Sequence, residues 1–146
     1  FYEPRTVHES SLSPCVYSII AAEVGYEDKA VELYQRSARL DLDNYNNDTE
    51  DGLHITSMVG SWMSIVHGFA GMRAHENELT FSPMIPKDWN GYSFNMLWRG
   101  HHLTITSTRD YVTIKQTGGT DVSITVYGNV VNVPANDAVT IETVKA

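Results

Sequence analysis

The sequence contains a single cysteine, Cys15, and no run of about 18 apolar residues in its 146 positions. One cysteine excludes an internal disulfide and a cysteine-built metal site, and it is typical of a reducing compartment. Without a long apolar run, the chain has no segment that could span a bilayer as a helix. We therefore expect a cytoplasmic protein with no membrane as partner.

Basic residues are also scarce, since 10 Lys and Arg stand against 18 Asp and Glu and give a net charge of -8. This balance argues against nucleic acid as a partner. Apolar residues make up 42% and charged residues 19%, which is typical of a packed globular protein. The length allows one domain or two small ones.

The first part of the chain has helical periodicity. A first helix is predicted with Ser13 as N-cap, Pro14 at the first helical position and Gly25 as its end. A second helix is predicted from Glu27 to Leu40, because apolar residues recur on one face and charged residues on the other. The short connection between them indicates antiparallel neighbours.

An Asn- and Asp-rich loop over residues 41–52 precedes a third helix, predicted from about Thr56 to Met72. This helix is apolar nearly all round and contains three glycines, which is typical of a helix inside a larger helical body. Three helices cannot enclose it, so we expect further sequence of the same protein to complete its surroundings.

After Glu76 the pattern changes to strict alternation, as in Tyr92–Trp98 and Val122–Val126. Six or so short antiparallel strands joined by glycine-containing turns predict a β-sandwich. The fold class is therefore α+β, with residues 1–76 helical and residues 77–146 forming the sandwich.

Two polar clusters lie directly before predicted helices. His8, Ser10 and Ser11 precede the first, and His54 and Ser57 lie at the start of the third. Helix N-termini carry unsatisfied N–H groups and a partial positive charge, so they bind anions such as phosphate. Each cluster alone is also explained by ordinary capping. If both helices start at one rim of a helical barrel, the two clusters can meet on one anion.

The histidines His101 and His102 do not predict a metal site, because adjacent residues of a strand point to opposite faces. The acidic loop departs from a calcium-binding loop in its glycine and glutamate positions. We therefore expect no metal.

Four segments, residues 5–14, 40–47, 49–58 and 83–89, closely resemble glycoside hydrolase family 65, and most of all its maltose-cleaving phosphorylases. The resemblance covers essentially the whole chain. It implies that residues 1–76 are the last helices of an (α/α)6 catalytic barrel and residues 77–146 the C-terminal sandwich. It also implies an inverting phosphorolysis, in which maltose and phosphate give β-glucose 1-phosphate and glucose.

The resemblance implies a role for particular residues. By position, His8, Ser10, Ser11, His54 and Ser57 are the expected phosphate-binding residues. The general acid of the family lies upstream of Phe1, so we expect no catalytic residue in this chain and no activity of the chain alone.

Glu9 stands beside the expected phosphate site, where an ionised carboxylate repels the anion unless it turns to a sugar hydroxyl or to Arg5. We therefore place Glu9 on the substrate side. The expected partners are the disaccharide, phosphate as co-substrate without any cofactor, the N-terminal part of the same protein, and a second copy in a homodimer. Two alternatives stay open: an inverting hydrolase of the same fold acting on kojibiose or trehalose, and a standalone sugar-binding or structural module.

Overall fold

The computed structural model describes residues 1–7, 10–47 and 49–144. The chain divides into two compact units, Phe1–Phe69 and Ala70–Ala146. The division falls before the residue-76 boundary predicted from periodicity, because the first strand already begins at Arg73. Within the described parts, no helix is long and apolar enough to cross a membrane.

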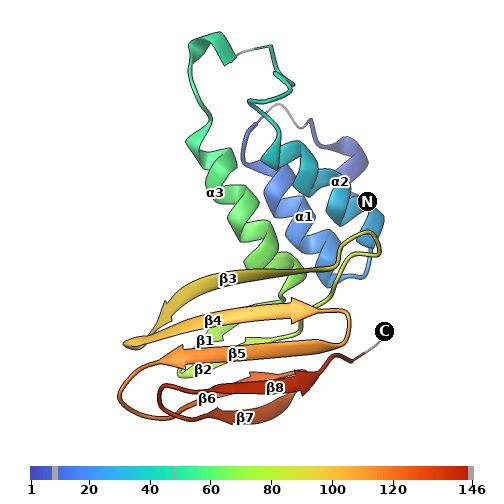
Figure 1. Cartoon of the computed structure of the whole chain (residues 1–146). Coiled ribbons are helices and arrows are strands. Elements are labelled where there is room, and N and C mark those ends of the chain that lie inside the picture. The colour runs from blue at the N-terminus through green and yellow to red at the C-terminus, as the bar shows by residue number, and fades with distance from the viewer. Residues whose placement is uncertain (8–9, 48, 145–146) are drawn as a thin grey trace. The chain divides into compact units, whose positions relative to one another are not determined.

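The first unit is helical. Its elements are η1 (Glu3–Arg5), α1 (Ser13–Glu23), α2 (Glu27–Ala38), η2 (Thr49–Asp51), α3 (Ile55–Met63) and the π-helical turn η3 (Ser64–Phe69), which continues α3. Helix α1 packs against α2, and α3 contacts both (Figure 1).

The predicted C-terminal end of α1 agrees with the structure, whereas the predicted N-cap does not. Gly25 ends the helix as predicted: its φ is +79°, and Tyr26 N donates to Ala21 O at 2.8 Å, as in a glycine C-terminal cap. The prediction of Ser13 as N-cap is wrong. Leu12 takes the cap position without a side-chain hydrogen bond, and Ser13 is the first helical residue, with its Oγ donating to Ser10 O at 3.4 Å.

The third helix is shorter than predicted, because its helical path ends at Phe69 rather than Met72. Gly71 has a φ of +58°, and a Cβ there would lie 2.8 Å from Ser82 O. The chain therefore leaves the helix through a position that only glycine occupies without strain, and enters the first strand.

The described residues of the second unit form eight strands in two sheets. The bounds are β1 (Arg73–His75), β2 (Glu78–Phe81), β3 (Gly91–Trp98), β4 (His101–Thr108), β5 (Tyr111–Thr117), β6 (Val122–Val126), β7 (Asn129–Val133) and β8 (Ala138–Glu142). The sheet orders are β1-β2-β6-β7 and β3-β4-β5-β8 (Figure 1). All pairs are antiparallel except β2 with β6, which is parallel, so the prediction of a purely antiparallel sandwich needs this correction.

The core of this unit lies between the two sheets. Phe81 on β2 and Phe94 on β3 meet with ring centroids 6.4 Å apart, which shows the layers in contact. The alternating residues of β4, β5 and β6 fill the rest: Leu103, Ile105, Val112, Ile114, Val122, Ile124 and Val126 are all buried. The predicted alternation is thus the pattern of a half-buried strand.

Candidate functional site

The structure brings the two predicted helix starts together. Ser11, just before α1, and Thr56, in the first turn of α3, share a hydrogen bond with 2.8 Å between Oγ and Oγ1. Thr56 is exposed and Ser11 is half-buried, so this contact lies at the edge of the surface. The neighbouring Ser10 Oγ accepts from Leu12 N at 3.2 Å, which places it at the start of α1.

His54 occupies the N-cap position of α3 and is paired with Asp41. Its Nδ1 lies 2.6 Å from Asp41 Oδ1, and its backbone N donates to Asp41 Oδ2 at 2.9 Å. The side chains are 24% and 13% exposed, respectively. These hydrogen bonds from the His54 ring and backbone hold the pKa of the Asp41 carboxyl below its ordinary value of 3.8.

Ser57 lies behind this surface, only 2% exposed. Its Oγ donates to Ser37 O at 2.7 Å, and Ser37 Oγ donates back to Ser57 O at 3.3 Å. Its backbone N donates to His54 O at 2.9 Å. The geometry therefore uses Ser57 to hold α3 against α2, and a direct contact with phosphate stays a prediction.

His8 and Glu9 lie outside the described residues, so their predicted roles rest on sequence position. Arg5, one of the two partners considered for Glu9, donates from its guanidinium to Phe1 O at 2.7 Å and stacks over the Phe1 ring.

Asp41 is the residue that sequence reasoning missed. It stands among several acids of the loop, and the interpretation of that loop as a solvated rim treated them alike. In the structure Leu40, which directly precedes Asp41, is only 4% exposed. A buried residue at this point fixes the direction of its neighbours, and Asp41 is the carboxylate that turns to the helix start.

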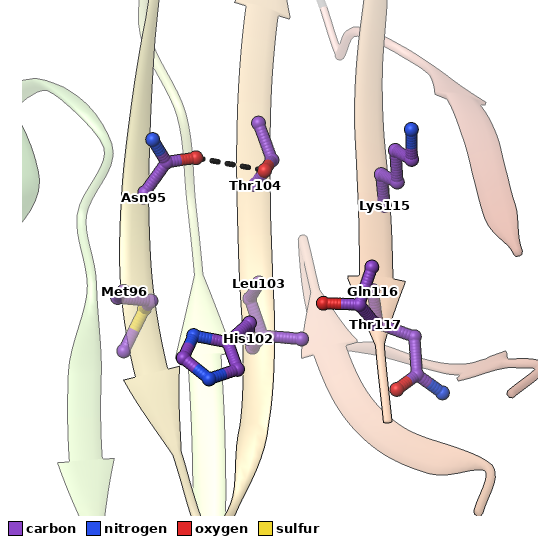
Figure 2. Close-up of a pocket in the computed structure, with 8 residues that line it drawn as sticks. All are labelled: Asn95, Met96, His102, Leu103, Thr104, Lys115, Gln116 and Thr117. Atoms are coloured by element: carbon purple, nitrogen blue, oxygen red, sulfur yellow. Dashed lines mark hydrogen bonds between the residues drawn. The ribbon is translucent and has the colours of Figure 1, made fainter. Parts of the chain in front are cut away.

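The sheet β3-β4-β5 has a separate shallow hollow of about 450 Å³. Asn95, Thr104 and Lys115 are partners across these strands, and Thr104 Oγ1 donates to Asn95 Oδ1 at 2.7 Å (Figure 2). His102 lines this hollow, whereas the adjacent His101 turns to the buried Gln116, with Nδ1 2.9 Å from Oε1. The two histidines therefore face opposite sides of the strand, and the expectation that they hold no metal stays a prediction.

Comparison with known proteins gives matches over most of the chain. Residues 1–63 match the glycosyl hydrolase family 65 central catalytic domain, and residues 72–133 match the C-terminal domain of the same family. A maltose phosphorylase of Bacillus subtilis is 57% identical over 127 residues, which is 87% of this chain and 17% of that protein. An alpha,alpha-trehalose phosphorylase of Thermoanaerobacter brockii is 45% identical over 124 residues, 85% of this chain and 16% of the relative.

A solved structure, described as a putative kojibiose phosphorylase from human microbiome, superposes with a TM-score of 0.91 and 40% sequence identity. The match covers 99% of this chain and 21% of that one. The chain therefore spans about a sixth to a fifth of the length of these relatives. Two consecutive family domains, matched in their family order, show that the chain belongs to glycosyl hydrolase family 65.

Proposed function

We propose that the chain forms the C-terminal part of a cytoplasmic inverting disaccharide phosphorylase and supplies the phosphate-binding side of its active site. The observation that carries this proposal is the meeting of the two helix starts through Ser11 and Thr56, in a chain whose relatives are phosphorylases. Maltose is the favoured substrate, because identity to the maltose phosphorylase is 57% against 45% for the trehalose enzyme.

In the proposed reaction, phosphate attacks the anomeric carbon from one face while an acid protonates the leaving oxygen from the other. We place the acid, and the remaining helices of an (α/α)6 barrel, in the N-terminal part of the same protein. We assign phosphate binding to the described residues: the hydroxyls of Ser10 and Ser11 and the ring of His54 donate to phosphate oxygens in this proposal. Phosphate is the co-substrate, and no metal or other cofactor takes part.

The chain carries a net charge of -8, so its overall field opposes an anion. Local donors must therefore outweigh that field. Two helix N-termini and a histidine meet this need, because N–H groups and a charged imidazole form short, strong hydrogen bonds with an oxyanion.

The test is the phosphate dependence of cleavage by the complete enzyme. Maltose, kojibiose and trehalose are each incubated with and without phosphate, and β-glucose 1-phosphate and glucose are quantified. We expect maltose to be consumed fastest, and only with phosphate. Equal cleavage without phosphate would show a hydrolase, and faster use of another disaccharide would overturn the substrate assignment.

Replacement of His54 tests the site itself. We expect His54→Ala to weaken phosphate recognition by roughly 1.5–3 kcal/mol, the usual size for a hydrogen bond to a charged group, and so to raise the phosphate KM about ten- to a hundredfold. His102→Ala, which removes a histidine from the sheet surface, is the control and should leave this KM unchanged. An unchanged phosphate KM in His54→Ala contradicts the assignment.

A further inference from the structure

The contact between Asp41 and His54 has two points of attachment. One carboxylate oxygen accepts from the ring and the other from the backbone N–H of the same residue, at 2.6 and 2.9 Å. A ring contact alone would fix the imidazole, and a backbone contact alone would cap the helix. Together they fix the rotation of the ring relative to the start of α3.

The same contact decides which ring nitrogen carries the proton. The pKa of Asp41 lies below its ordinary value, so at neutral pH the carboxylate is ionised and only accepts hydrogen bonds. Nδ1 must then be the donor, which makes Nε2 the atom through which His54 would meet a ligand. When His54 takes up a proton from solvent at Nε2, both ring nitrogens donate, Nε2 to the bound anion and Nδ1 to Asp41, and the carboxylate stabilises this imidazolium.

Asp41 is held in place by features other than His54. Leu40 is buried and anchors the chain directly after α2. The next residues continue as turns, with Asp43 N donating to Arg39 O at 2.9 Å and Tyr45 N to Leu40 O at 3.2 Å. The carboxylate is therefore presented by a fixed backbone, as a positioning group requires.

We propose that Asp41 is a positioning residue for phosphate recognition, holding the His54 ring as its Nδ1–H form with Nε2 directed to the anion. This inference rests on the proposed function of His54. Asp41 itself does not touch phosphate, so its removal acts through the histidine.

The first experiment compares Asp41→Asn with Asp43→Asn in the complete enzyme. The two aspartates lie two residues apart and lose the same charge, but Asp43 pairs with the exposed Arg39 instead of His54. We expect Asp41→Asn to raise the phosphate KM about tenfold, with kcat and the maltose KM within about twofold, and Asp43→Asn to change none of these. Equal effects of the two variants overturn the proposal.

A double-mutant cycle separates positioning from a general loosening of the loop. If Asp41 acts through His54, then Asp41→Asn adds no further rise in phosphate KM to His54→Ala. A further rise overturns the inference. If His54→Ala alone leaves the phosphate KM unchanged, the proposed function fails instead, and the two failures are thereby distinguished.

The nitrogen chemical shifts of the His54 ring give a readout independent of activity. In the unaltered protein at neutral pH we expect Nδ1 to carry a proton, and in Asp41→Asn we expect a shift toward the Nε2–H tautomer, which free imidazoles favour. Asp43→Asn should leave the spectrum unchanged. A His54 ring with the same tautomer in Asp41→Asn and the unaltered protein contradicts the positioning role.

Discussion

The two units of the chain bury their apolar residues in different ways. In the sandwich, inward residues such as Ile105, Val112 and Ile114 are fully buried between two sheets of the same unit. In the helical unit, α1 and α3 leave large apolar side chains exposed, among them Val16, Ile20, Ile55, Met58, Val59 and Trp62. The sandwich thus completes its own core, whereas the helical unit carries more apolar surface than its described residues cover.

This difference bears on where the candidate site lies. The helical unit holds its two helix starts by a few specific polar contacts, namely Ser11 with Thr56, Ser57 with Ser37 and Asp41 with His54. The sandwich relies mainly on apolar area, which is non-directional. Substitutions should therefore act on the sandwich through stability, and on the helix starts through ligand recognition.

The largest effect is expected at Gln116, a buried amide that interrupts the apolar core of the sandwich. Gln116 is fully buried, and its Nε2 donates to Thr120 O, Val133 O and Pro134 O at 2.9–3.0 Å. Gln116→Met keeps the volume but leaves these carbonyls without their donor. We expect it to lower the free energy of unfolding by about 3 kcal/mol, measured by denaturant titration.

Lys115→Met is the matched control for Gln116→Met, because Lys115 precedes it on β5 and lies exposed on the opposite face. A change within about 0.5 kcal/mol is expected there. If Gln116→Met lowers the free energy of unfolding as little as Lys115→Met does, the three carbonyls find other hydrogen-bond donors when Gln116 is removed.

The sandwich strands show what alternation in sequence can and cannot predict. Strands β3 and β6 contain the alternating segments Tyr92–Trp98 and Val122–Val126 from which strands were predicted. Strand β1 has three residues and β7 reads Asn-Val-Val-Asn-Val, so neither gives a clear period of two. The parallel pairing of β2 with β6 joins segments more than 40 residues apart, and no local pattern specifies it.

A smaller effect is expected where the helices of the first unit approach most closely. Gly60 lies on the buried side of α3, and an added Cβ would meet Cys15 Cβ at 2.8 Å and Ser37 Oγ at 3.3 Å. Gly60→Ala must therefore push α3 away from α1 and α2. We expect a loss of about 2 kcal/mol in the free energy of unfolding, read as a fall in the thermal midpoint.

Gly119→Ala serves as the control for Gly60→Ala, since its added Cβ meets nothing within 4 Å. If Gly60→Ala is as stable as this control, the three helices are packed less closely than their contacts indicate. The comparison between the units would then rest on the sandwich alone.

The candidate site was predicted in outline from the order of residues. A histidine and hydroxyls before a helix mark an anion site, and two such starts predict convergence. Sequence could not show that Ser57 faces inward, because its direction depends on how α3 rotates against α2. Nor could it select Asp41, since a contact across 13 residues depends on where buried Leu40 anchors the loop.

The smallest expected effect is the pH dependence of the stability that the pair Asp41 and His54 contributes at the start of α3. The pKa of Asp41 is lowered in the folded state by its hydrogen bonds to His54, so ionised Asp41 favours folding above its ordinary value of 3.8. This contribution is present at neutral pH and is lost as the pH falls through the lowered folded-state pKa. The stability difference between the unaltered protein and Asp41→Asn should therefore shrink below pH 4, in urea titrations at stepped pH. A difference that persists unchanged to pH 2 would show that the carboxylate charge of Asp41 does not hold this helix start.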